Sequence, residues 1–120
     1  MQQEIKGLLG LVDGAKAVPH SHILAVETFR DACRMSWMHR RVHGMTLRTL
    51  AEVSGLYPSH VTDYLNQCDT DKHGKARRDL PASKIAAFES VTGNTYVSQW
   101  LALQSGLTVL ESLIAERKAA

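Results

Sequence analysis

The sequence predicts an all-α protein, and three observations support this fold class. Apolar residues recur at spacings of three and four, strand-like alternation is nearly absent, and glycines separate the apolar segments. A chain of 120 residues fits one folded unit, and a hydrophobic content of 44% is enough for one core. The formal net charge is only +2, so overall charge does not by itself indicate a nucleic-acid ligand.

Two helices are expected in the first third of the chain. A short one fits Ile5–Val12, and a longer one fits Ser21–His43, introduced by Pro19 and ended by Gly44. The apolar stripe expected on the longer helix comprises Ile23, Val26, Phe29, Cys33, Trp37 and Met38.

Two short helices are expected next, close together. Thr46 can cap a helix at Leu47–Ser54, and Gly55 can end it. A second helix begins at Pro58 and runs to about Leu65. The residues of the first that are expected to face inward are Leu47, Leu50, Ala51 and Val53.

A long loop and three further helices complete the predicted order. Residues Asn66–Leu80 have no apolar period and predict a loop that is long for a compact domain. Helices are expected at Pro81–Thr92, Thr95–Ser105 and Thr108–Lys118. Their apolar anchors are Ile85, Phe88 and Val91, then Val97, Trp100 and Leu101, then Leu110, Leu113 and Ile114.

The segments LRTLAEVSGL (47–56) and PSHVTDYLN (58–66) have the features of a helix-turn-helix. Ala51 is small where two helices would cross closely, and Gly55 stands at the turn, where a positive φ is expected. Apolar residues that would join the helices are Leu50, Leu56, Val61 and Leu65. The second helix then has one buried face and one small polar face, which suits the major groove of DNA.

These segments resemble the lambda-repressor-like (Cro/repressor, XRE-type) family of helix-turn-helix regulators. The resemblance extends over Phe29–Val91, and LPASKIAAFESVTGN (80–94) is similar to the helix that closes the five-helix bundle of this family. By analogy, the favoured subfamily is that of small bacteriophage-type regulators with added C-terminal helices. The resemblance implies a transcriptional regulator of prokaryotic or phage type that binds operator DNA, commonly as a dimer, without a cofactor.

The resemblance also assigns the residues that contact double-stranded DNA. They are Tyr57, Pro58, Ser59, His60, Thr62, Asp63 and Asn66, with Arg48 near a phosphate. The second helix departs from the family in lacking Arg and Gln, the usual base-reading side chains. Asp63 would repel phosphate unless it contacts a cytosine amine or pairs within the protein.

Basic residues flank the two helices on both sides. They are Arg40, Arg41 and His43 before them, and Lys72, His73, Lys75, Arg77 and Arg78 after them. The functional interpretation is a phosphate clamp, and the alternative is a solvated charged loop. With a clamp, Arg77→Ala combined with Arg78→Ala weakens binding to all DNA, whereas Thr62→Ala blurs discrimination between sites.

The chain is expected to divide into an N-terminal segment (1–20), a DNA-binding bundle (21–93) and C-terminal helices (94–120). The C-terminal helices hold more apolar surface than a minimal bundle needs. This surface either wraps onto the core or forms a two-fold interface. The favoured hypothesis is a homodimer, with contacts at Leu107, Leu110, Leu113 and Ile114.

Other classes of protein find little support. His39 and His43 have a metal-ligand spacing without a completing ligand, and no catalytic set or phosphate-binding loop stands out, so neither an enzyme nor a small-molecule substrate is expected. Cys33 and Cys68 predict reduced thiols. The absence of a signal peptide or membrane-spanning pattern predicts a cytoplasmic protein. The rival hypothesis is a helical protein-interaction module that has lost DNA binding.

Overall fold

The computed structural model describes residues 14–106 and 109–119, and their regular secondary structure is helical, which confirms the all-α class. Two isolated β-bridges are the only extended pairings in these ranges. The expected helix at Ile5–Val12 lies outside the described residues. The elements are α2 (His20–Leu24), α3 (Phe29–Met38), α4 (Leu47–Ser54), α5 (Pro58–Tyr64), η1 (Ala82–Lys84), α6 (Ile85–Thr92), α7 (Tyr96–Ser105) and α8 (Val109–Ala119).

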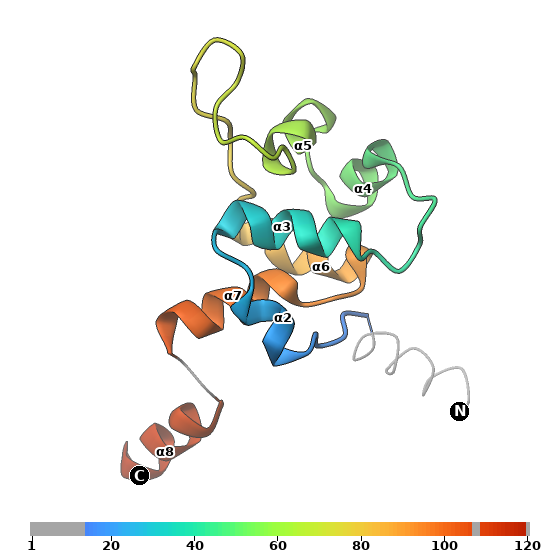
Figure 1. The fold of residues 1–120 in the computed structure, drawn as a ribbon. Coiled ribbons are helices and arrows are strands. Elements are labelled where there is room, and N and C mark those ends of the chain that lie inside the picture. Colours follow the sequence, from blue (N-terminus) through green and yellow to red (C-terminus); the bar gives the residue numbers. More distant parts are fainter. Residues whose placement is uncertain (1–13, 107–108, 120) are drawn as a thin grey trace, which may run out of the picture.

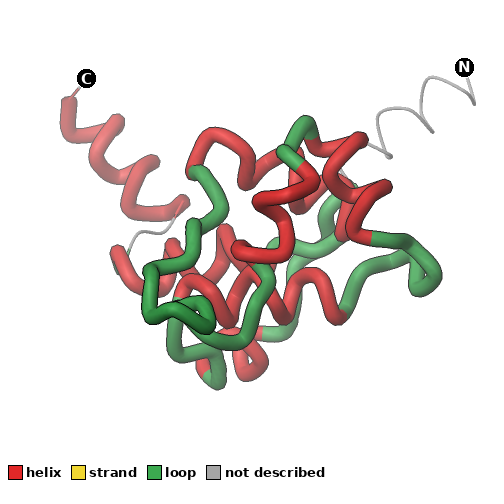
Figure 2. Tube along the Cα trace, turned by 90° about the horizontal axis from the view of Figure 1, so that it is seen from above, coloured by secondary structure: helices red, strands yellow, loops and turns green. Residues whose placement is uncertain are grey.

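Helix α3 is the centre of the bundle (Figure 1). Helix α7 packs along it, α5 and α6 also contact it, and α4 contacts both α5 and α6. Helix α8 extends away from the bundle in two perpendicular views (Figures 1 and 2). The most deeply buried apolar side chains are Ile23, Ala32, Cys33, Leu50, Ala51, Val61, Phe88, Tyr96 and Val97.

The prediction of a single long helix at Ser21–His43 is wrong, because the helical backbone is interrupted between α2 and α3. Thr28 has extended backbone angles (φ −130°, ψ 162°), and its side chain accepts a hydrogen bond from the amide of Asp31. Thr28 is therefore the N-cap of α3, which begins at the next residue. The indole of Trp100 donates a hydrogen bond of 3.0 Å to the carbonyl of Val26 in the break. This carbonyl therefore has a partner on α7 in place of a helical one.

Helix α3 also ends earlier than expected, at Met38. The side-chain amide of Asn94 donates hydrogen bonds to the carbonyls of Ser36 (2.9 Å) and His39 (3.3 Å). Carbonyls at a helix end lack helical partners, and a buried asparagine from the α6–α7 turn supplies one here. The apolar stripe is correspondingly shorter, and Met38 is exposed.

The inward position expected for Val53 is also wrong, since its side chain is 65% exposed. The buried face of α4 consists of Leu50, Ala51 and Ser54. This face follows the helical spacing of three and four residues, and Val53 lies beside it.

Helix α7 belongs to the same core as the helices before it. Tyr96 and Val97 are buried, and Trp100 contacts Phe29 with ring centroids 6.4 Å apart. The carboxylate of Glu89 on α6 accepts hydrogen bonds from the backbone amide (3.0 Å) and the hydroxyl of Ser98. These bonds satisfy a donor in the first turn of α7. The bundle therefore continues past residue 93, and among the helices that the structure describes only α8 stands apart from it.

Burial raises the pKa of the Glu89 carboxyl group above its ordinary value of 4.5. A raised pKa in the folded state means that this group stabilises the fold fully below pH 4.5 and loses that contribution as the pH rises through the folded-state pKa. Glu89→Gln keeps an oxygen for Ser98 and removes the charge. We expect its free energy of unfolding, relative to that of the wild type, to rise in denaturant titrations as the pH is increased from 4.5.

The control for this prediction is Glu27→Gln, at an exposed carboxyl group. A constant difference in unfolding free energy between Glu89→Gln and the wild type at all pH values would contradict the raised pKa.

Candidate nucleic-acid interface

Helices α4 and α5 are joined by a short turn at one edge of the bundle (Figure 1). Gly55 ends α4 with a left-handed backbone (φ 70°), and the amide of Leu56 donates to the carbonyl of Ala51 at 2.9 Å. Pro58 then occupies the first turn of α5, where a missing N–H costs nothing. The helix bounds expected from sequence are confirmed here.

Helix α5 buries one side and exposes the other. Val61 and Tyr64 are 1% and 5% exposed, whereas Tyr57 at its start is 71% exposed. The other exposed side chains of this stretch are Pro58, Ser59 and Thr62. The outer face of α5 is therefore uncharged and carries two small hydroxyl groups, which can donate or accept hydrogen bonds.

His60 contributes to this face only in part. Its ring lies between those of Tyr57, at 5.0 Å, and Tyr64, at 6.3 Å. The ring is half-buried and contacts the exposed ring of Tyr57.

Asp63 is paired within the protein. One carboxyl oxygen accepts from Arg77 at 3.1 Å and the other from Arg78 at 2.9 Å. Partial burial would raise the pKa of Asp63, but the hydrogen bonds and charges of Arg78 and Arg77 outweigh it and hold this pKa below its ordinary value of 3.8. Both arginines expected to clamp phosphates thus hold a carboxylate of α5.

The loop after α5 contains an ordered turn, which we call the basic hairpin (residues 69–78). Its tip is closed by Asp71, whose carboxylate accepts from the amides of His73 (2.8 Å) and Lys75 (2.9 Å). Gly74 has a positive φ of 77°, and Thr70 and Ala76 form a bridge between the two arms. The exposed tip carries the basic residues Lys72, His73 and Lys75.

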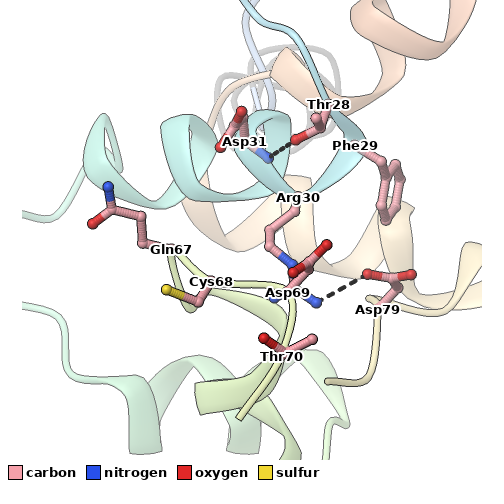
Figure 3. A pocket seen from close by; sticks show the side chains of 9 residues that line it. All are labelled: Thr28, Phe29, Arg30, Asp31, Gln67, Cys68, Asp69, Thr70 and Asp79. Carbon is pink, nitrogen blue, oxygen red and sulfur yellow. Dashed lines mark hydrogen bonds and ion pairs between the residues drawn. The ribbon is translucent and has the colours of Figure 1, made fainter. Parts of the chain in front are cut away.

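A buried arginine that the sequence pattern did not single out, Arg30 on α3, joins this hairpin to α5. Figure 3 shows it beside Asp79. The side chain of Arg30 is 8% exposed and forms an ion pair of 3.1 Å with Asp79. It also donates to the carbonyls of Asp63, Asn66 and Arg78. The signal in the sequence was a positive charge three positions before Cys33 on an apolar helix face.

The pocket beside Arg30 has a volume of about 600 Å³ and lies between the start of α3 and the loop after α5 (Figure 3). Its lining includes three carboxylates, Asp31, Asp69 and Asp79, and the exposed Cys68. The carboxylates of this lining would repel a phosphate group, so the pocket is unsuited to bind one.

The arginines before α4 contact the body of the protein. The guanidinium of Arg40 lies 4.1 Å from the centre of the Trp37 ring and donates to the carbonyl of His43 at 2.8 Å. Arg41 donates from its side chain to the carbonyls of Gly14 and Ser90. The structure therefore places Arg41 on the α6–α7 side of the bundle, and does not bring it together with α5.

The remaining predicted contact residues differ in whether their side chains are bound to other groups of the protein. Arg48 is 85% exposed and forms an ion pair with Glu52, one helical turn later, at 3.3 Å. Asn66 uses its side-chain oxygen to accept from the amide of Cys68 at 3.0 Å. Lys84, which sequence reasoning missed, lies beside the turn, with its ammonium 3.3 Å from the position of a Cβ on Gly55.

Of the predicted dimer contacts, Leu107 lies outside the described residues. Leu110, Leu113 and Ile114 on α8 are 66%, 60% and 44% exposed. The structure thus shows an apolar surface on α8 that the rest of the described chain does not cover.

Fold and site together define an all-helical bundle that exposes a short polar helix next to a basic hairpin. Comparison with models of protein families, with curated proteins and with solved structures finds no match for this chain. Among the helices of residues 14–106 and 109–119, none has the length and apolar character needed to cross a membrane.

Proposed function

We propose that this chain is a cytoplasmic transcriptional regulator of prokaryotic or phage type that binds operator DNA. In this proposal α4 and α5 form a lambda-repressor-like helix-turn-helix. The observation that carries it is the position of α5, which exposes an uncharged polar face at an edge of the bundle, next to a basic hairpin. A helix of this kind fits the major groove while flanking cations contact phosphates.

The proposed contacts divide into two kinds. Ser59 and Thr62 make hydrogen bonds to base edges or nearby phosphates, and the ring of Tyr57 packs against the same DNA groups. Phosphate contacts come from Arg48 and from the hairpin tip, where Lys72 and Lys75 are exposed. With few cations involved, specific binding depends on the α5 face more than on bulk charge.

Selection from a pool of random duplexes tests this function. The full chain is incubated with the pool, bound duplexes are enriched, and affinity for the enriched and the starting DNA is measured against salt concentration. A regulator enriches a defined motif and binds it more tightly than the starting pool, with affinity falling as salt rises. No binding to any duplex at low salt would contradict the proposal.

Thr62→Ala is expected to reduce discrimination between the enriched site and random DNA by about 1–3 kcal/mol. The hydroxyl is exposed on α5 and makes only a weak contact of 3.4 Å with the carbonyl of Ser59, so its loss costs the fold little. Affinities for both duplexes are measured by fluorescence anisotropy.

Ser21→Ala is the control, because this exposed hydroxyl lies on α2, away from α5 (Figure 1). If Thr62→Ala weakened binding to both duplexes equally, Thr62 would be a phosphate contact and not a specificity residue.

We further propose that two copies pair through α8. An isolated helix of this length is marginal in water, so its apolar residues indicate a packing partner. In an antiparallel pair of copies, the exposed side chains of Leu110, Leu113 and Ile114 would face one another. This arrangement gives two recognition helices for a two-fold symmetric site.

Leu110→Glu combined with Ile114→Glu is expected to convert a dimer to a monomer, because four buried carboxylates would meet at the interface. Sedimentation equilibrium of the full chain measures the mass. The control is Leu24→Glu, at an apolar side chain of α2 that is 61% exposed. A wild-type chain that stays monomeric at all concentrations would contradict the pairing.

The rival function, a protein-interaction module, is supported by one observation. Val53 and Tyr57, on either side of Gly55, are 65% and 71% exposed, which gives this edge an apolar part. The failure to bind any duplex in the selection experiment would favour this rival.

A further inference from the structure

We propose that Asp63, Arg77 and Arg78 act as a clasp that joins α5 and the basic hairpin into one DNA-binding surface. Arg77 and Arg78 are then positioning residues, and the lysines at the tip, Lys72 and Lys75, contact the DNA backbone beside the site read by α5. The inference rests on the proposed function and assigns the roles of residues within it.

The first support is the geometry of the clasp. Each carboxyl oxygen of Asp63 has its own arginine, at 3.1 Å and 2.9 Å, so both oxygens are engaged within the protein. The guanidinium of Arg77 also donates to the carbonyl of Thr70 at 3.1 Å. Arg77 therefore links α5 to both arms of the hairpin at once.

A second anchor holds the same parts from the side of the core. Arg30 binds the carbonyls of Asp63 and Asn66 at the end of α5, and the carbonyl of Arg78 at 3.2 Å. The last residue of the hairpin is thus tied to the end of α5 through its backbone as well as through its side chain. A hairpin fixed at two places moves with the helix.

The burial of the two ion-paired groups indicates that the clasp stays closed. The side chains of Arg77 and Asp63 are 21% and 19% exposed, whereas that of Arg78 is 59% exposed. Moving both arginines to phosphates would cost Arg77 its bonds to Asp63 and Thr70, and would leave the partly buried carboxylate of Asp63 without its two ion pairs. The same carboxylate would then repel the DNA.

The tip differs from the clasp in being free of ion pairs. Among the described residues, neither Lys72 nor Lys75 has an acidic partner within 4.0 Å, and both are exposed. The Asp71 turn holds the backbone between them. The hairpin lies beside α5, at the end of the molecule opposite α8 (Figure 1). The hairpin and α5 can therefore contact one duplex together.

The first test needs no DNA. Asp63→Asn keeps the shape of the side chain and removes the charge that holds both arginines. We expect faster hydrogen exchange at the amides of Asp71 and Arg77, whose carbonyl partners lie across the hairpin, at 2.8 Å in both cases. Exchange at core amides and the far-UV circular dichroism should stay unchanged, and unchanged exchange in the hairpin would overturn the clasp.

The second test is a double-mutant cycle on the enriched duplex. Lys72→Gln combined with Lys75→Gln should weaken binding and reduce its salt dependence. In the Asp63→Asn background the same change should matter less, with a coupling of at least about fivefold in affinity. Asp63→Asn alone should tighten binding to random DNA, because it releases two cations, and weaken binding to the enriched site.

The outcomes separate this inference from the function on which it rests. Additive effects in the cycle, with wild-type binding intact, would overturn the clasp as a positioning device and leave the regulator. A wild-type chain that binds no duplex would overturn the proposed function itself.

Discussion

Arg30→Ala is expected to lower the free energy of unfolding by about 3 kcal/mol or more, because each buried polar group left without a partner costs about 1–3 kcal/mol. The guanidinium of Arg30 donates hydrogen bonds to the carbonyls of Asp63, Asn66 and Arg78 and to the carboxylate of Asp79. Its removal breaks the link that ties the end of α5 and the end of the hairpin to α3. Urea titration followed by circular dichroism measures the change.

Arg34→Ala on the same helix is the matched control. Its side chain is 27% exposed and forms an ion pair with Asp31, one turn earlier, at 3.5 Å. Surface pairs of this kind contribute about 0–1 kcal/mol. Equal losses of stability for the two variants would show that Arg30 acts as a surface charge and not as a buried link.

Gly93→Ala is expected to cost about 2–3 kcal/mol, the sum of backbone strain and a steric clash. Gly93 has a φ of 83°, and a Cβ there would lie 2.5 Å from Nε of Arg41 and 3.1 Å from its Cβ. The backbone of Arg41 is held close by, since its amide donates to the carbonyl of Thr92 at 2.8 Å. Arg41 would have to give up its side-chain bonds across the turn.

Gly74→Ala separates the two contributions, because Gly74 has a similar φ of 77° but a Cβ added there would meet no heavy atom within 4 Å beyond its chain neighbours. It should cost only the strain, about 1 kcal/mol in an exposed turn. If Gly93→Ala were no more destabilising than Gly74→Ala in thermal or urea unfolding, the packing of Arg41 on the α6–α7 turn would be wrong.

The parts of the fold that the sequence alone determined are those governed by neighbours along the chain. Thr46, Gly55 and Pro58 define the ends of α4 and α5 through a side-chain cap, a left-handed residue and a fixed φ. Each of these effects acts within a few residues, so local sequence was enough to predict them. The same holds for α7 and for the loop after α5.

The break after α2 could not be predicted in this way. Ile23, Val26 and Phe29 keep a helical period across it, and the pattern does not show that the indole of Trp100, 74 residues later, binds the carbonyl of Val26. Asn94 likewise ends α3 from far along the chain. A helix pattern states which residues can share a face, but distant donors decide where the backbone leaves the helix.

In the candidate site, too, some features follow from the local sequence and others only from the tertiary structure. The polar face of α5 followed from its sequence, because one buried stripe at helical spacing leaves the opposite face exposed. Whether a charge is available to a ligand followed only from the tertiary structure. Asp63, Arg77 and Arg41 are all polar residues in a basic region, yet each is held by a partner that folding brings to it. The sequence determines which residues carry a charge, but the folded chain determines the distances between charged groups, and so which of them are paired.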